Sequence, residues 1–215
     1  MDKPFMYEPM TVITDLMIAA LAFYFAKQLS NQLEVTLSNT QWHWCRAFIM
    51  LGVGAFLGAV SHGWGPYMPE FYKDWLWKMT TYSIGFVSFF IIMGTLYTLL
   101  PYKTVQLVRY IPVILLSIYL FQITKDPQFI NVIKFYAPSM VFTLVAMLIL
   151  YFSKGMEGSG SIIVGILISF VAAGVQMSGF SLHKHFNYND IYHVIQMFGL
   201  YYMFKGAQVL KDYIS

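Results

Sequence analysis

Seven apolar stretches follow one another almost from end to end of this 215-residue chain. A helix needs about 20 residues to cross the roughly 30 Å of hydrocarbon in a bilayer. Backbone polar groups inside that layer must be satisfied internally, which favours helices. The pattern predicts an all-α fold, a polytopic membrane protein built as a seven-transmembrane helix bundle. The expected spans lie near residues 12–29, 44–64, 75–100, 105–123, 129–152, 161–180 and 190–210.

Composition supports the membrane assignment and excludes several other classes. Hydrophobic residues make up 58% of the chain and charged residues 11%, whereas a soluble domain has about 25% charged residues. No hydrophilic stretch is long enough for a second domain, so residues 1–215 are expected to form one. Cys45 is the single cysteine, which excludes an internal disulfide. The net charge of +3 includes no basic run, so nucleic acid is not an expected partner.

Proline and glycine mark the breaks between the spans. Turns are predicted at Gly65-Pro66, Pro101, Lys125-Asp126-Pro127 and 155–160. Two further prolines, Pro112 and Pro138, lie inside the fourth and fifth spans. They predict kinks, which membrane helices tolerate when neighbours satisfy the freed backbone groups.

The orientation of the chain in the membrane follows only weakly from its charges. An odd number of spans places the two termini on opposite sides. Seven Lys and Arg residues fall on the carboxy-terminal side and six on the amino-terminal side, which barely decides the positive-inside rule. We expect the amino terminus outside and the carboxy terminus in the cytoplasm. Richness in Lys, Ile, Tyr and Phe with only two arginines favours an AT-rich, bacterial genome, and therefore the inner membrane.

Polar residues within the spans collect at one side of the expected bundle. His62 closes the second span and His193 opens the seventh, so both lie on the same side of the membrane. Asp15 lies in the first two turns of the first span, and we expect it to pair with a histidine or to be protonated. Ionisable groups inside a bilayer are costly and usually mark a functional site. Other polar residues at this depth are Thr80, Thr81, Ser83 and Gln176.

The second span carries Gly54, Gly58 and His62 at four-residue spacing. These positions share one helical face, and the two glycines form the close-packing motif of membrane helices. The spacing therefore predicts that His62 points toward another helix. The alternative is a histidine at the headgroup boundary that bonds a carbonyl group or water.

The start of the seventh span has its own polar cluster. His193 follows Asp190 by three residues and Asn189 by four, so both pairs can converge on one helical face. Side chains at such spacing can chelate one metal ion. Asn189 or Asp190 is equally suited to cap the helix, because its oxygen accepts the first free backbone N–H groups. His183 and His185, in the preceding loop, are further ligands or solvated loop residues.

Two short segments, Gly58-Ala-Val-Ser-His62 and Asn189-Asp-Ile-Tyr-His193, carry a resemblance to a known family. The chain resembles the superfamily of alkaline ceramidases and adiponectin-type receptors (CREST), which are seven-helix membrane hydrolases with zinc inside the bundle. That superfamily has Ser-x-x-x-His on its second conserved helix and His-x-x-x-His on its last. This sequence has Gly58 in place of the serine and Asn189 in place of the first histidine.

The resemblance implies a zinc site. His62 and His193 would be ligands, with His185, His183 or Asp190 as the third. Three protein ligands and one water are the arrangement of catalytic zinc, which lowers the pKa of the bound water to about 7.

The first hypothesis is accordingly a metal-dependent hydrolase that acts on a lipid amide or ester taken from the membrane. Asp190 or Asp15 would orient or deprotonate the zinc-bound water. Ser61 could replace the missing serine and donate a hydrogen bond to the developing oxyanion. A lipid is then both the surrounding solvent and the substrate.

Two alternatives remain open from the sequence. The second hypothesis is a non-enzymatic protein that binds a small molecule, an ion or a proton at a cluster of Asp15, His62, Asp190 and His193, in which histidine titrates near neutral pH. The third is a bundle held together by buried polar contacts worth about 0.6 kcal/mol each. Metal content separates the first hypothesis from the other two. The sequence sets no oligomeric state and no particular substrate.

Overall fold

The computed structural model describes residues 5–183 and 186–213, and these are helical almost throughout. The all-α prediction is confirmed. The described residues form α1 (Pro9–Thr36), α2 (Asn39–Trp64), the 3₁₀ turn η1 (Gly65–Tyr67), α3 (Glu70–Leu99), α4 (Tyr102–Val108), α5 (Tyr110–Lys125), α6 (Phe129–Lys154), α7 (Ser159–Ser178) and α8 (Tyr188–Val209).

Six helical segments in the described part of the chain are long and apolar enough to cross a membrane. They are α1, α2 with η1, α3, α4 with α5, α6, and α7. This confirms a polytopic helical membrane bundle. The seventh long helix, α8, has 22 residues and spans about 33 Å, but its polar residues make it less apolar than the others. A seventh crossing by α8 therefore stays a prediction.

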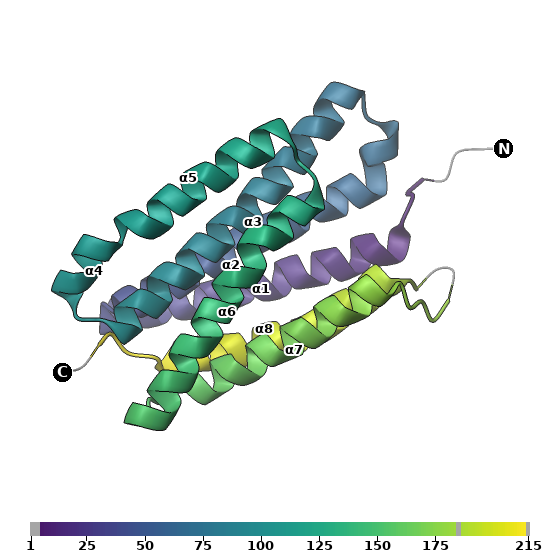
Figure 1. Cartoon of the computed structure of the whole chain (residues 1–215). Helices are drawn as coiled ribbons and strands as arrows, with labels where there is room; N and C mark the ends of the chain where they lie inside the picture. The colour runs from purple at the N-terminus through teal and green to yellow at the C-terminus, as the bar shows by residue number, and fades with distance from the viewer. Residues whose placement is uncertain (1–4, 184–185, 214–215) are drawn as a thin grey trace.

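The helices pack as hairpins joined by one oblique helix. The helix α2 packs between α1 and α3, and α7 packs along α8, which also contacts α1. Figure 1 shows α6 beginning beside α3 and crossing the bundle to end beside α7. The segment of α4 and α5 lies on the outside of α3. The first part of α6 thus packs against α3 and its last part against α7.

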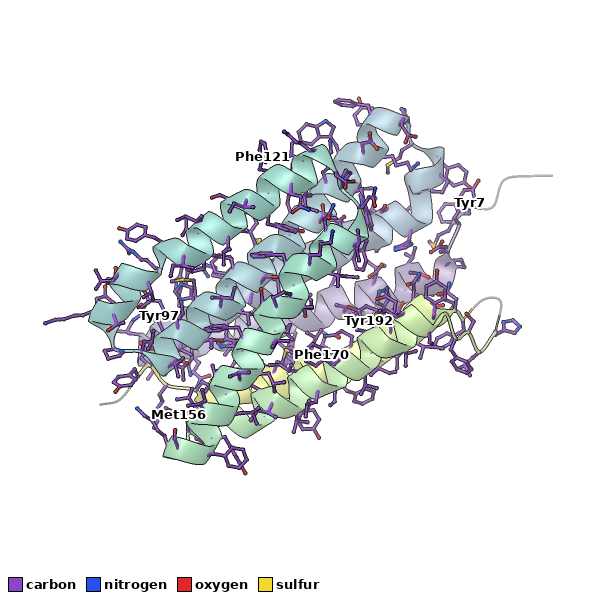
Figure 2. The ribbon with its side chains drawn as sticks, viewed as in Figure 1. Tyr7, Tyr97, Phe121, Met156, Phe170 and Tyr192 are labelled. Carbon is purple, nitrogen blue, oxygen red and sulfur yellow. The ribbon has the colours of Figure 1, made fainter. Side chains whose placement is uncertain are left out.

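The described chain begins and ends at opposite ends of the bundle (Figure 1). The N–H of Tyr7 donates to the carbonyl of Gly63 at the end of α2, over 3.1 Å. The N–H of Tyr213 donates to the carbonyl of Tyr97 near the end of α3, over 2.8 Å. Figure 2 shows Tyr7 and Tyr97 at these two ends. The seven crossings predicted from the sequence would require this arrangement. We call the end where α1 and α8 begin the amino-terminal end.

Close packing of α7 on α8 depends on facing glycines. A Cβ added to Gly165 would lie 2.7 Å from the carbonyl oxygen of Gly199, and one added to Gly206 would lie 2.6 Å from that of Gly158. Such backbone contact between membrane helices requires small residues. Residue spacing in the sequence predicted only the Gly54 and Gly58 motif of this kind.

The kink predicted at Pro112 lies one turn earlier in the chain. The helix is interrupted at Arg109, between α4 and α5, and Pro112 lies in the first turn of α5. Proline lacks an N–H and its ring clashes with the carbonyl four residues before it, here that of Val108. The adjacent bond from Val113 N–H to the Arg109 carbonyl is long, at 3.4 Å. Pro138, by contrast, lies inside the continuous helix α6.

Candidate functional site

A cavity of about 320 Å³ lies inside the amino-terminal half of the bundle, among α1, α2, α3, α6, α7 and α8. It lies where α6 leaves α3 and crosses toward α7. Its volume is at the lower end of the range for small-molecule sites. The polar residues that line it are Asp15, His62, Thr80, Gln176, Asn189, His193 and Gln196. Apolar residues that line it include Ile18, Leu51, Ile84, Val87, Val132 and Ile133.

The polar lining residues lie mainly at one end of the cavity. Asp15, His62 and Asn189 come from helix turns at the amino-terminal end. Leu51 lies three turns deeper along α2 than His62, and Val87 lies well inside α3. At the amino-terminal end the cavity therefore has polar residues beside the apolar Phe129, Val132 and Ile133 of α6, and toward the middle of the bundle its lining is mainly apolar. This confirms the prediction that the polar residues collect at one side.

Asp15 and His193 form a buried pair at the polar end of the cavity. Their exposed fractions are 6% and 8%, and Nε2 of His193 lies 3.4 Å from Oδ1 of Asp15. The prediction that Asp15 pairs with a histidine is confirmed. On the other side of the ring, Nδ1 lies 2.9 Å from the Thr14 hydroxyl.

The Thr14 hydroxyl has two acceptors within reach, and its choice sets the histidine tautomer. Its oxygen lies 3.1 Å from the carbonyl of Thr11 and 2.9 Å from Nδ1 of His193, and its one proton can go to either. When the hydroxyl donates to Nδ1, Nε2 carries the ring proton and faces Oδ1 of Asp15. Two lone pairs repel, so the contact between Nε2 and Oδ1 is attractive only with a proton between them. The pair can thus hold a proton and exchange it with a bound molecule.

One oxygen of Asp15 has no hydrogen-bond partner in the described structure. Oδ2 is buried without a donor, and a Cβ added to Gly58 would lie 3.3 Å from it. Gly58 therefore leaves room for the carboxylate between α1 and α2. Gly54, Gly58 and His62 all line the cavity, as their shared helical face predicted. Buried acceptors without partners are uncommon and call for an explanation.

Asp190 has a different role from Asp15. It is fully buried, accepts from the Thr11 hydroxyl over 2.9 Å, and accepts from the N–H of Asn187 over 2.7 Å. The prediction that Asn189 or Asp190 is the N-cap is wrong. Asn187 is the N-cap and Asp190, three residues later, closes a capping box. The Asn-x-x-Asp spacing was a usable signal for this box. Asp190 is absent from the cavity lining, while Asn189 accepts from Gln176 over 3.1 Å.

His62 lies at the mouth of the cavity with a partner that the sequence analysis missed. Its Nδ1 lies 2.7 Å from Oε2 of Glu8, and the two side chains are 30% and 47% exposed. Glu8 directly precedes α1, and His62 ends the second span at the same level of the bundle. That shared level was the sequence signal that could have predicted their contact. Ser61 lies in the last turn of α2 beside Gly65 and does not line the cavity.

The predicted zinc ligands are brought together only in part. His62 and His193 line the same cavity, but their ring nitrogens contact Glu8, Thr14 and Asp15. Within residues 5–183 and 186–213, no group of three His, Cys, Asp or Glu side chains could hold a metal ion. His185 lies outside the described residues, and the backbone of His183 forms an isolated bridge with Phe186. The described residues do not fit zinc, and the zinc site stays a prediction.

Fold and cavity define a class: a polytopic helical membrane protein with a ligand-sized cavity that has most of its polar residues at one end and a mainly apolar lining toward the middle of the bundle. Within that class, the chain belongs to the family of unknown function DUF6962, which it matches over residues 10–212. No curated protein and no solved structure matches it. The family match carries no link to the ceramidase and adiponectin-receptor superfamily.

Proposed function

We propose that this protein binds a small amphiphilic molecule from the membrane, with the polar head at Asp15 and His193 and the apolar part in the deeper cavity. The observation that carries the proposal is the buried Oδ2 of Asp15, which has no donor although Asp15 lines a cavity of ligand size. Ligand sites typically combine apolar walls with a few convergent polar groups.

The bilayer changes which part of such a ligand determines affinity. Lipid tails are as apolar as Leu, so moving an acyl chain from lipid into the cavity gains packing but little hydrophobic free energy. Recognition of the head must supply the selectivity. A donor that bonds Asp15 replaces an unsatisfied buried acceptor, which costs about 1–3 kcal/mol. A site at the membrane boundary also lets the head enter without crossing the hydrocarbon.

Filling the cavity tests this proposal. Ala55 lines the cavity, and Ala55→Phe is expected to remove most of its volume. Val145→Phe is the matched control, because Val145 is 50% exposed on the outside of α6. Native mass spectrometry of the full chain in nonionic detergent would count bound dodecylamine and dodecanol, and thermal unfolding would verify each variant.

We expect one molecule bound per chain in the wild type and in Val145→Phe, and at least about tenfold weaker binding in Ala55→Phe. Equal binding by all three proteins, or the absence of a defined stoichiometry, would contradict the proposal.

A zinc-dependent lipid amidase related to the CREST superfamily is the second candidate function. The observation that favours it is that His62 and His193, from helices far apart in the sequence, line one cavity with Asp15. Carboxylates that bond histidine ligands are common around metal sites. The described residues supply no third ligand, so no catalytic step follows from them.

Elemental analysis separates the two candidates. The amidase requires stoichiometric zinc in the purified protein, and its loss in His62→Ala and in His193→Ala. The binding function predicts that His62→Ala keeps ligand binding with no change in zinc content. Zinc at one ion per chain that both variants lose would replace the first candidate by the second.

For location, we infer the inner membrane of a bacterium, with the amino-terminal end of the bundle facing outward. Ser181 and Glu157 are exposed in connections at opposite ends of the bundle. In a Cys45→Ala background, a membrane-impermeant maleimide added to spheroplasts should label Ser181→Cys and spare Glu157→Cys. The reverse pattern would invert the orientation, and labelling of both without lysis would contradict the spanning of α7.

A further inference from the structure

We propose that the polar head of the ligand is a protonated amine that donates an N–H to Asp15. This inference rests on the proposed binding function and specifies the ligand class. It goes beyond that function because an amphiphile could equally carry a phosphate, a carboxylate or a hydroxyl group.

The first argument is the unsatisfied oxygen. Asp15 is 6% exposed, Oδ1 faces His193, and Oδ2 has no donor. Gly58 lies beside Oδ2 without a side chain, and both residues line the cavity. Because Asp15 and Gly58 both line the cavity, a ligand bound there is the available source of a donor for Oδ2. An ammonium N–H is the strongest partner for it, since charge-assisted hydrogen bonds are about twice as strong as neutral ones.

The second argument is the balance of charge around the cavity. The described residues that line it include no Lys and no Arg. Glu8 lies at the mouth, where it contacts His62. Asp190 of α8 is buried and accepts from Thr11, which lies one helical turn before Asp15 in α1. The basic side chains in the described lining are His62, which contacts Glu8, and His193, which contacts Asp15, so an anionic head would face carboxylates whose histidine partners are already engaged. Charge repulsion is strong at low dielectric constant, so the site disfavours phosphate and carboxylate heads.

The third argument is the aromatic lining. Trp77, Tyr136 and Tyr192 come from three different helices and all line the cavity. In Figure 2, Tyr192 lies between α6 and α7. Aromatic faces attract cations, and the attraction increases where water is excluded. A carboxylate combined with aromatic side chains is a suitable surrounding for an ammonium group and offers nothing comparable to an anion.

Four ligands with the same twelve-carbon chain test the inference: dodecylamine, dodecanol, dodecanoate and dodecyltrimethylammonium. The last carries the positive charge but no N–H. Binding to the full-length protein in nonionic detergent would be measured at pH 7 by isothermal titration calorimetry. We expect dodecylamine to bind about 10- to 100-fold more tightly than dodecanol. Dodecyltrimethylammonium should bind less tightly than the amine, and dodecanoate most weakly.

Asp15→Asn tests the acceptor. The asparagine retains an oxygen and the shape of the side chain but loses the charge, so the preference for amine over alcohol should fall close to one. Asp74→Asn is the matched control, since Asp74 is exposed on the first turns of α3 and does not line the cavity. It should retain the full preference. The wild-type ligand series stays decisive even where the Asp15 variant loses its fold.

The possible failures are distinguishable. If none of the four ligands binds with a defined stoichiometry, the proposed function is wrong. If dodecanol, dodecanoate or dodecyltrimethylammonium binds as tightly as dodecylamine, the cavity remains a ligand site and the amine inference is overturned. A full amine preference in Asp15→Asn would also overturn it.

Discussion

At the scale of single residues, two buried aspartates about one helix turn apart in depth have opposite roles. Asp190 uses both oxygens, one on Thr11 and one on the backbone of Asn187. Asp15 uses one oxygen on His193 and leaves the other without a donor. Asp190 is therefore part of the scaffold, and Asp15 is the side chain that can receive a ligand.

Thr11→Val tests the structural role of Asp190. The substitution keeps the side-chain shape but removes the donor to Oδ1, leaving a fully buried carboxylate oxygen unsatisfied. We expect a loss of about 1–3 kcal/mol in the free energy of unfolding, measured by denaturant titration in mixed micelles. Ser117→Ala is the control, because Ser117 is exposed and bonds only within its own helix. A Thr11 variant as stable as this control would contradict the assignment.

The sequence could predict part of this site. Helical spacing and the alternation of spans place His62, His193 and Asp15 at one end of the bundle, and the structure brings all three to one cavity. Spacing could not tell which carboxylate is satisfied, because that depends on partners such as Thr11, 179 residues from Asp190. The ligand-binding oxygen of Asp15 is thus visible only once tertiary contacts are known.

At the scale of helices, glycines fix how closely neighbours approach. Gly85 of α3 lies against the ring of Tyr119 in α5, and an added Cβ would overlap that ring. The ring cannot easily move, since its hydroxyl donates to the Thr81 carbonyl over 2.7 Å and it stacks on Phe135 with centroids 4.8 Å apart. This contact joins α3, α5 and α6, and α3 and α6 are walls of the cavity.

Gly85→Ala should therefore destabilise the protein. Overpacking of a fixed contact costs about 1–3 kcal/mol. Gly174→Ala is the matched control in α7, because nothing lies within 4 Å of its added Cβ. Alanine at that position should stabilise the helix by about 0.5–1 kcal/mol. Thermal unfolding of both variants gives the comparison, and equal melting temperatures would refute the packing account.

Hydropathy could predict where the long helices lie in the sequence, but it could not predict how closely neighbouring helices pack. The seven predicted stretches correspond to the long helical segments, with α4 and α5 sharing one stretch. The glycine contacts between α7 and α8 and the tight fit at Gly85 depend on which faces meet. Residue periodicity predicted one such packing face, that of Gly54 and Gly58. It did not predict which helices the other glycines would contact.

At the scale of the whole molecule, Asp212 joins the segment after α8 to the start of α2, at the end of the bundle opposite the amino-terminal end. The carboxylate of Asp212 accepts from the Ser38 hydroxyl over 2.9 Å and from the N–H groups of Asn39 and Thr40 over 3.0 and 2.7 Å. Burial would raise the pKa of Asp212, but the hydrogen bonds from Thr40 and Asn39 outweigh it and lower the pKa below 3.8. A negative charge at the start of α2 also suits the helix dipole.

The lowered pKa of Asp212 predicts a specific pH dependence. The folded-state pKa lies below the unfolded value, so the stabilisation is complete above about pH 4 and is lost as the pH falls through the folded-state pKa. Asp212→Asn should melt at a lower temperature than the wild type between pH 5 and pH 7, by a constant difference that shrinks below about pH 4. Glu157→Gln, exposed at the same end, is the control. A difference that grows on acidification would contradict the assignment.

The central claim is that an amphiphile occupies the cavity among α1, α2, α3, α6, α7 and α8. Photocrosslinking tests it most directly, with a dodecylamine that carries a diazirine near the end of its chain, followed by peptide mass spectrometry. The account predicts labels on deep lining residues such as Ile18, Leu51 and Val87, which excess dodecylamine removes. Labels confined to outward-facing residues such as Phe121 and Val145, unaffected by competitor, would contradict it.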